Sequence, residues 1–346
     1  MTFPTGIRRA LLGGALLALA GHATAGPNSY TELGPDGGRT TQVLFDQLVD
    51  DRLYLFGQKV GVHRSDDDGA TWQPINPDLP QIASTSISGL AVSTVDGTVY
   101  VADNSNVVAR SPDAGQTWIA SDSELGFGVT TVFTDPVNAD IVYATAGALV
   151  YKSINGGDTW ANVTGTLGFT VVDEIAIDPS NSDRILVTGW EGVARSTDGG
   201  AMWETLSNGL PAPDSNGWIF ANVLGIDPID PDVAYAFVSN DGVYKTLDFG
   251  DSWSKVSVNL PNDFFTRLIF DPANTDTLIV GTGNNDVIVS FDGGATWSDL
   301  INFGLGDYTI NDVALDPDNS IRLFAASSAR GVYVTDDGAF SWQETS

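Results

Sequence analysis

The eight residues 290–297, SFDGGATW, decide the fold because the same pattern recurs along the whole chain. Six more copies fit Ser/Thr-x-Asp-x-Gly-x-Thr-Trp with small changes: SDDDGATW ending at Trp72, SPDAGQTW at Trp118, SINGGDTW at Trp160, STDGGAMW at Trp203, TLDFGDSW at Trp253 and TDDGAFSW at Trp342. Successive tryptophans are 46, 42, 43, 50, 44 and 45 residues apart. A repeat of this length is typical of one four-stranded blade of a β-propeller.

Each element of the repeat suits a tight turn between two strands, which we call the repeat turn. The Asp accepts backbone N–H bonds, the Gly adopts a positive φ, and the Trp buries a large ring between blades. Ala339 stands where the other copies have Gly, so we expect the seventh turn to be the most strained or the most altered. The structural acceptors are expected to be Asp67, Asp113, Asn155, Asp198, Asp248, Asp292 and Asp337.

Short β-type runs surround every repeat turn, and in the fourth unit they cover residues 172–178, 184–190, 192–197 and 202–206. In units three to seven an Asp-Pro pair ends the first run, because Pro cannot donate to a strand ladder. The pattern predicts an all-β fold, a seven-bladed β-propeller of four-stranded antiparallel blades. The last unit supplies its own fourth strand, so residues 30–33 (YTEL) are expected to add beside blade seven or to cover it.

The combined pattern resembles a known family. Asp-Pro followed by a strand, and then Gly-Val-Tyr-Lys/Arg-Ser/Thr before the turn, is similar to the bacterial neuraminidase repeat, or Asp-box, β-propellers. That family includes sialidase-like, sortilin-type and xyloglucanase propellers and a photosystem II assembly factor. The resemblance covers about residues 30–346, and it implies a fold more than a chemistry, because this fold carries enzymes and binding modules alike. It also implies that the functional face lies opposite the repeat turns.

The N-terminus predicts export. Arg8 and Arg9 precede an apolar stretch at 10–20 and a small-residue cleavage site at 23–25, so residues 1–25 read as a secretory signal peptide. Eleven apolar residues are short of the ~20 that span a bilayer, and no later stretch is long enough. We therefore expect residues 26–346 to form one propeller domain, monomeric and without a membrane span, that is secreted or periplasmic.

Composition excludes several kinds of partner. The chain has 15 Lys and Arg against 44 Asp and Glu, a formal charge of -29, which makes nucleic acid an unsuitable ligand. Without Cys and with only 2 His, thiolate sites and three-His metal centres are excluded, and we expect no cofactor. The acidic runs at 66–68 and 316–318 could offer oxygens to calcium, but they lack EF-hand spacing and suit turns better.

Two tryptophans lie outside the repeat turns and form the first candidate site. Trp190 falls in the link between the second and third runs of unit four, and Trp218 ends the longest connection between units. Together with Glu191, Asp214 and Phe220 they suit the apolar faces and hydroxyls of a sugar. The alternative is that both rings only fill space between blades.

A second candidate site is the mouth of the central channel, at the start of the innermost strands. Paired carboxylates such as Asp173 with Asp312 could act there as acid and base on a glycosidic bond, and a solvated polar rim is the alternative. Glu174 is a further catalytic candidate and Arg267 a ligand-binding one. The residues expected at this mouth are Asp173 and Glu174, Asn222 and Val223, Thr266 and Arg267, and Asn311 and Asp312.

The sequence favours a non-enzymatic binding or scaffold propeller that recognises a neutral glycan or a partner protein opposite the repeat turns. The alternative is a glycoside hydrolase acting on neutral polysaccharide. Sialidase activity is disfavoured, because sialidases have six blades, an Arg-Ile-Pro segment and an arginine triad that this chain does not match. Its negative charge would also repel an anionic sugar.

Overall fold

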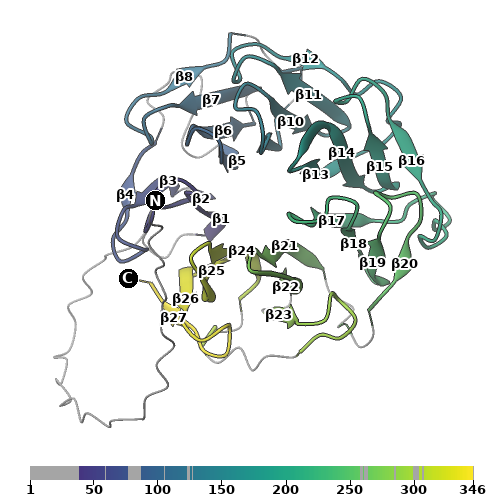
Figure 1. Ribbon diagram of the computed structural model, residues 1–346. Coiled ribbons are helices and arrows are strands. Elements are labelled where there is room, and N and C mark those ends of the chain that lie inside the picture. The colour runs from purple at the N-terminus through teal and green to yellow at the C-terminus, as the bar shows by residue number, and fades with distance from the viewer. Residues whose placement is uncertain are drawn as a thin grey trace, which may run out of the picture. The chain divides into compact units, whose positions relative to one another are not determined.

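The computed structural model describes residues 39–345 except 59, 77–86, 105, 123–124, 127, 258–259, 261–263, 284–285, 299–303 and 306–307. These residues belong to one compact unit, Glu32–Ser346, and the elements they form are all strands. Seven antiparallel sheets are arranged in a ring around a central axis, as Figure 1 shows. The predicted seven-bladed propeller is confirmed, whereas the proposed signal peptide and residues 30–33 lie outside the described residues.

The first four blades follow the chain in order. Blade 1 contains β1 (Arg39–Phe45), β2 (Leu53–Gln58), β3 (Gly61–Ser65) and β4 (Gln73–Pro74). Blade 2 contains β5 (Ile87–Val92), β6 (Val99–Asp103), β7 (Val107–Ser111) and β8 (Ile119–Ala120). Blade 3 contains β9 (Thr131–Thr134), β10 (Val142–Ala146), β11 (Leu149–Ser153) and β12 (Ala161–Asn162). Blade 4 contains β13 (Val172–Asp178), β14 (Asn181–Gly189), β15 (Gly192–Ser196) and β16 (Glu204–Leu206).

The remaining three blades repeat the arrangement. Blade 5 contains β17 (Ala221–Ile226), β18 (Ala234–Val238), β19 (Gly242–Thr246) and β20 (Ser254–Lys255). Blade 6 contains β21 (Phe265–Asp271), β22 (Asn274–Thr282) and β23 (Val287–Ser290), and a bridge from Val289 to Ser298 marks the place of its fourth strand. Blade 7 contains β24 (Ile310–Asp316), β25 (Asn319–Ser327), β26 (Gly331–Thr335) and β27 (Gln343–Glu344).

The first strand of each blade is innermost and carries a recurrent irregularity. In six of the seven blades the register between first and second strand shifts near the start of the first strand, as in β13 between Val172 and Glu174. A β-bulge of this kind leaves one residue unpaired and re-aims its neighbours. The bulged residues are Thr41, Ser88, Asp173, Asn222, Thr266 and Asn311. Consecutive residues can therefore face the channel together.

The repeat turns are built by one hydrogen-bond pattern. In blade 2 the Asp113 carboxylate accepts the N–H of Thr117 at 2.7 Å and the hydroxyls of Thr117 and Ser111 at 2.6 and 2.8 Å. The Ser111 hydroxyl in turn accepts the N–H of Gly115 at 2.7 Å. Asn155 keeps the acceptor role, because its Oδ1 accepts the N–H of Thr159 at 3.0 Å. In these two turns the residue at the acceptor position named from the sequence accepts the hydrogen bonds that close the turn.

The seventh turn is altered at Ala339, as expected. Ala339 is fully buried with φ 74°, a left-handed conformation that costs a side chain with a Cβ more than it costs Gly. Its N–H lies 3.3 Å from the Thr335 hydroxyl, whereas the corresponding Gly115 bond in blade 2 is 2.7 Å. The turn keeps its shape with a weaker inner hydrogen bond.

The turn acceptors should contribute measurably to stability. Asp248→Ala removes the acceptor for the Ser252 N–H and hydroxyl, at 2.8 and 2.6 Å, and is expected to lower the free energy of unfolding by about 1–3 kcal/mol. Leu247→Ala is the matched control, because Leu247 is 69% exposed in the same turn and should change stability by less than ~0.5 kcal/mol. Urea unfolding of both variants checks this, and equal losses would contradict it.

Neighbouring blades are connected by hydrogen bonds from side chains for which the sequence pattern predicted no role. The Tyr100 hydroxyl and the Arg110 guanidinium both donate to the carbonyl of Gly156 in the next blade's turn, at 3.3 and 3.2 Å. Tyr143 and Lys152 repeat this on the carbonyl of Gly199, at 3.1 and 2.9 Å. The Tyr of the second strand and the Lys or Arg of the third therefore clamp one blade to the following turn.

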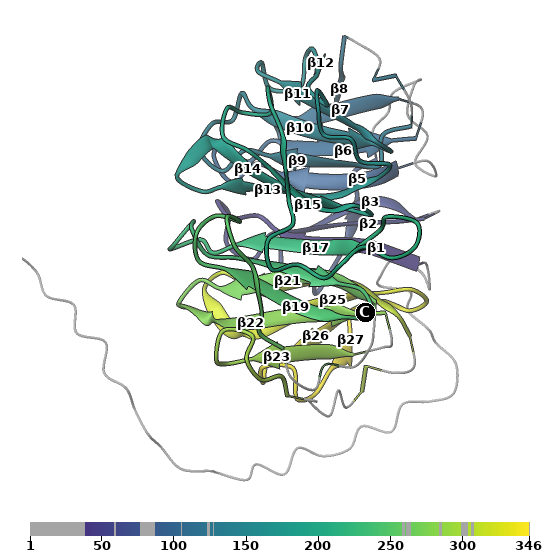
Figure 2. The same ribbon diagram turned by 90° about the vertical axis from the view of Figure 1, so that its right-hand side faces the viewer.

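The ring closes between blade 7 and blade 1 without exchange of a strand among the described residues. The Thr40 hydroxyl donates to the carbonyls of Ser327 and Gly331 at 3.0 and 2.6 Å. The Asn311 amide donates to the Thr40 carbonyl at 2.6 Å, and the Asp312 carboxylate accepts the N–H of Val43 at 3.1 Å. β27 belongs to blade 7 itself, as predicted. Figure 2 shows the ring edge-on.

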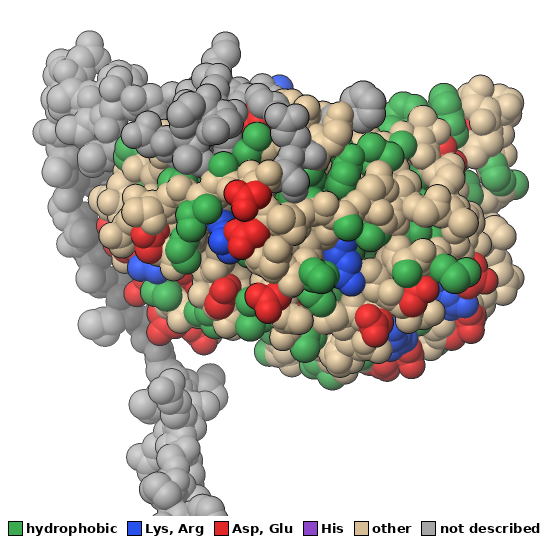
Figure 3. Space-filling model, turned by 90° about the horizontal axis from the view of Figure 1, so that it is seen from above, with side chains coloured by type: hydrophobic (Ala, Val, Ile, Leu, Met, Phe, Trp, Pro, Cys, Tyr) green, Lys and Arg blue, Asp and Glu red, His purple; other side chains and the backbone are tan. Residues whose placement is uncertain are grey.

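The outer wall is polar and mixed in charge. In Figure 3 blue Lys and Arg side chains lie beside red Asp and Glu ones, with hydrophobic side chains scattered between them. Arg110 pairs with Asp158 at 2.5 Å and Arg195 with Asp251 at 2.6 Å, for example. Within the part of the chain that the structure describes, there is no helix long and apolar enough to cross a membrane.

Candidate functional site

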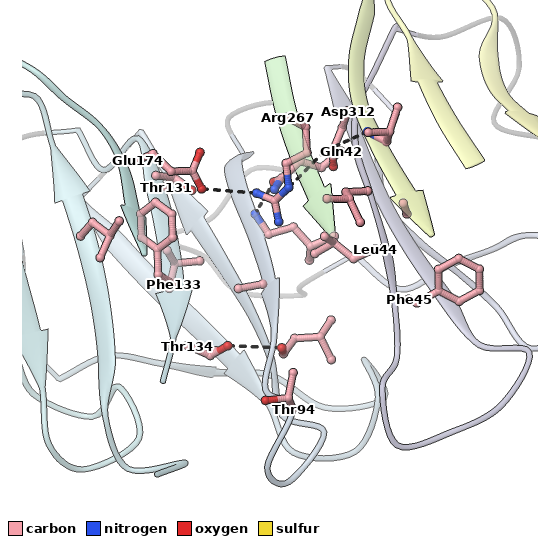
Figure 4. Close-up of a pocket in the computed structure, with 18 of the residues that line it drawn as sticks. Gln42, Leu44, Phe45, Thr94, Thr131, Phe133, Thr134, Glu174, Arg267 and Asp312 are labelled. Atoms are coloured by element: carbon pink, nitrogen blue, oxygen red, sulfur yellow. Dashed lines mark hydrogen bonds and ion pairs between the residues drawn. The ribbon is translucent and has the colours of Figure 1, made fainter. Parts of the chain in front are cut away.

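A cavity of about 530 Å³ occupies the central channel and is lined by the innermost strands. Polar side chains surround its upper end, and we call them the collar. Below them lies an apolar throat formed by Leu44, Phe133, Ile177, Ile269 and Leu315. Figure 4 shows this layering, with Glu174, Arg267 and Asp312 above Phe133 and Leu44, and Thr94 and Thr134 at the far end. The collar consists of Gln42, Thr131, Asp173, Glu174, Thr266, Arg267, Asn311 and Asp312.

Arg267 lies at the centre of the collar, between two carboxylates from other blades. Its Nη1 is 3.4 Å from Glu174 Oε1, and its Nε is 3.7 Å from Asp312 Oδ1 (Figure 4). Asp312 is held in place by the N–H groups of Val43 and Val313 at 3.1 and 3.0 Å. The Arg267 side chain is still 34% exposed, because it faces the cavity.

The structure changes the expected pairing of carboxylates. Arg267 joins Asp312 to Glu174, whereas Asp173 lies close enough to Glu191 for that carboxylate to act on its pKa. The pair of Asp173 with Asp312 was one example drawn from the residues expected at this mouth, which also included Arg267. The bulge in β13 explains the difference, because it lets both Asp173 and Glu174 line the cavity. Asn222 and Val223 do not line it.

Burial raises the pKa of all three collar carboxyl groups. Desolvation raises the pKa of Glu174 to about 7, opposed by Arg267 and reinforced by Asp312 and Asp173. Desolvation likewise raises the pKa of Asp312 to about 6, opposed by Arg267. For Asp173, desolvation and then the Glu191 charge raise the pKa to about 6. Desolvation disfavours the Arg267 cation, yet Asp312 and Glu174 outweigh it and raise its pKa.

These shifts predict a protein that is more stable in mild acid. A carboxyl whose folded pKa is raised binds its proton more tightly in the folded state, so stability increases as pH falls through 7 and 6. Burial lowers the pKa of His63, which acts in the opposite direction. We expect the free energy of unfolding to be roughly 2 kcal/mol higher at pH 5 than at pH 8.

Urea unfolding across this pH range measures the effect, and Glu174→Gln is the informative variant. It removes the group with the highest of these pKa values, so it should flatten the profile and raise stability at pH 8. A wild-type profile that falls between pH 8 and pH 5, or one that Glu174→Gln leaves unchanged, would contradict the assignment.

The second candidate site brings together three aromatic rings, which we call the aromatic trio. Trp190 and Trp218 meet at 5.1 Å between ring centroids, and Phe220 lies 5.8 Å from Trp190 and 5.3 Å from Trp218. All three are partly exposed, and none is among the residues of the hydrophobic core clusters. Trp190 and Trp218, which the sequence placed on segments of adjoining blades, are in contact through their rings.

The backbone holds the trio in place. The Trp190 carbonyl accepts the N–H groups of Ile219 and Phe220 at 2.7 and 3.0 Å, which fixes the long connection onto the β14–β15 link. Phe220 has φ 54°, an uncommon conformation for a bulky residue. The antiparallel order of each blade puts this link at the end opposite the repeat turn that joins β15 to β16.

The two acids beside the trio have structural partners. The Glu191 carboxylate accepts the Thr170 N–H and hydroxyl at 3.0 and 2.5 Å. Asp214 accepts the N–H groups of Asn216 and Trp218 at 2.8 and 3.0 Å, and these bonds keep its pKa low. Both acids therefore order the loops that carry the rings.

Carboxylates of the acidic runs 66–68 and 316–318 have partners within the protein instead of facing a common metal site. Asp66 is paired with Arg52 and Arg64 at 2.7 and 2.8 Å, and Asp316 accepts the N–H of Asp318 at 2.9 Å within a turn. Among the described residues, no group of three or more His, Asp or Glu lies close enough together to hold a metal ion.

Known proteins resemble the chain at several levels. The model of the DUF6242 beta propeller domain matches residues 39–223, more than half of the chain. The photosystem II assembly lipoprotein Ycf48 of Synechococcus sp. (strain CC9902) is 26% identical over 256 residues, 70% of each chain. A xyloglucanase of Paenibacillus sp. is 26% identical over 177 residues, 38% of this chain and 17% of that enzyme.

Among solved structures, the GH74 xyloglucanase from Xanthomonas campestris superimposes with a TM-score of 0.73 at 16% identity. The match covers 90% of this chain and 54% of that one, so the chain spans about half the length of that enzyme. At this identity the likeness concerns the fold alone.

Proposed function

The chain belongs to the DUF6242 β-propeller family, and on that premise we propose that it is an exported binding protein that holds a neutral glycan at the aromatic trio. The observation that carries the proposal is the contact of three partly exposed rings on the face opposite the repeat turns. Aromatic rings of this kind offer the flat apolar surface that the faces of a sugar require. Relatives named as xyloglucanases act on glycans, which supports this ligand class.

The loop geometry supports a binding role over simple space filling. A ring that only stabilises the fold belongs in a core cluster, whereas the trio lies outside the clusters to which its neighbour Ile219 contributes. The Trp190 carbonyl fixes the segment that carries Phe220, so the three rings are held together before any ligand binds. Glu191 and Asp214 act here as positioning residues.

A glycan array tests the proposal with Trp190→Ala and Trp218→Ala. Each substitution is expected to weaken capture about 30-fold, the effect of an interface hot spot, while lowering the free energy of unfolding by only about 1 kcal/mol. Phe291→Ala is the control, since Phe291 is 63% exposed in a repeat turn on the opposite face. Early unfolding of both Trp variants, or glycan capture that neither variant weakens, would overturn the proposal.

The same glycan array also distinguishes this proposal from two other functions, glycoside hydrolysis and binding of a partner protein. Glycoside hydrolysis in the channel is favoured by the raised pKa of Glu174, but Arg267 lies between Glu174 and Asp312, where the scissile oxygen or a water would have to lie. Release of shorter sugars from captured glycans would support hydrolysis. Binding of a partner protein, suggested by the name of the Synechococcus relative, predicts that the array stays empty.

A further inference from the structure

We propose that the collar and throat of the central channel form a second binding site, for a single neutral sugar unit or a similar small polyol. This site is separate from the aromatic trio and does not depend on it. A cavity of about 530 Å³ falls within the ordinary size range of small-molecule sites. Its polar collar above an apolar throat also matches the usual composition of such sites.

Within the described part of the chain, the donors of Arg267 and the acceptors of Glu174 make only long contacts. Several other arginines of this chain lie close to a carboxylate, such as Arg184 with Asp178 at 2.7 Å and Arg322 with Asp68 at 2.7 Å. Arg267 instead approaches its two carboxylates only to 3.4 and 3.7 Å, and it remains open to the cavity. Its donors and the acceptors of Glu174 are therefore both available to a ligand.

The charges of the collar favour an uncharged ligand. An anion drawn to Arg267 would lie beside the carboxylates of Glu174 and Asp312, and an ammonium group drawn to those carboxylates would meet the guanidinium. Burying an unpaired ligand charge in such a site is costly. Hydroxyl groups both donate and accept, so a polyol can bond to Arg267 and to Glu174 together without adding a charge.

The remaining walls fit the body of a sugar ring. Asp312 is almost fully buried and held by two backbone N–H groups, so the carboxylate that faces Arg267 is fixed in position. Thr131 adds a hydroxyl to the collar, and the Phe133 ring and the Leu44 side chain lie beneath it (Figure 4). Polar groups around an apolar wall match the hydroxyl edge and the apolar face of a pyranose.

The test uses free monosaccharides with saturation-transfer NMR and titration calorimetry on the purified protein. The neutral probes are glucose, galactose, mannose and xylose, and the matched charged probes are glucuronate and glucosamine. We expect at least one neutral sugar to bind, and to bind tighter than both charged probes. Binding of glucuronate alone, of glucosamine alone, or of none of the probes would overturn the proposal.

Substitutions in the collar and in the aromatic trio show at which of the two sites the monosaccharide binds. Glu174→Gln and Thr131→Val preserve side-chain size, and each is expected to weaken sugar binding about tenfold, whereas Trp190→Ala should leave it unchanged. Monosaccharide binding that survives both collar variants would place the sugar elsewhere and overturn the channel site. Glycan capture that depends on Trp190 while monosaccharides fail to bind would remove the channel site and leave the proposed function standing.

Discussion

Replacing Arg267 by Met is expected to lower the free energy of unfolding by about 3 kcal/mol at pH 8 and by less than about 1 kcal/mol at pH 5. At pH 8 the substitution leaves Glu174 and Asp312 charged in the channel without their cation, and removing one partner of such a buried group is strongly destabilising. At pH 5 both carboxyls, whose pKa values are already about 7 and 6, become protonated and need no cation. Urea unfolding at the two pH values measures the difference.

The control for this prediction is the double variant Arg267→Met with Glu174→Gln. Removing one of the two stranded carboxylates should recover part of the stability at pH 8 and change little at pH 5. A loss that is the same at both pH values would mean that Arg267 stabilises the ring through packing of its side chain, not through its charge.

Phe324→Ala is expected to destabilise the protein by about 3–5 kcal/mol, because it empties the junction at which the ring closes. Phe324 is fully buried in β25, and its ring meets Phe45 of blade 1 edge-on at 5.4 Å. It packs in one cluster with Leu55 and Val332. β27 belongs to blade 7 itself, so the junction with blade 1 depends on such side-chain contacts, and the cavity opens onto this junction.

Phe340→Ala is the matched control, since Phe340 lies in the same blade but is 58% exposed. It should change stability by less than ~0.5 kcal/mol. Urea unfolding of the two variants compares them directly, and equal effects would show that closure does not depend on the core between blades 7 and 1.

Local signals made the fold predictable. Each repeat turn is encoded by eight consecutive residues. Its Asp and Gly indicate the same hydrogen-bond pattern in every copy, so the seven copies were enough to predict the number of blades. The left-handed conformation of Ala339 was predictable in the same way, because the other copies have Gly at this position and the turn requires a positive φ there. The approach of Trp190 to Trp218 followed from their places at the ends of adjoining segments.

The collar was only partly predictable because its contacts are not local. Glu174 and Arg267 are 93 residues apart in the chain; the repeat places both at the channel mouth but does not indicate that their side chains pair. The bulges that bring them there have no signature of their own in a single sequence. The bonds of Asp214 to Asn216 and Trp218 were not predictable either, because the sequence shows an acid beside an aromatic ring without indicating which backbone groups it accepts from.

The recurrent bulge links the channel lining to the contacts between blades. A bulged residue has no partner in the strand ladder, and its side chain can bond to the next blade instead: the Asn222 amide donates to the Phe265 carbonyl, and the Asn311 amide donates to the Thr40 carbonyl at 2.6 Å. Asn311 also lines the cavity, so a substitution there changes the closure of the ring together with the channel lining. At such a residue the lining of the channel and the stability of the ring change as one.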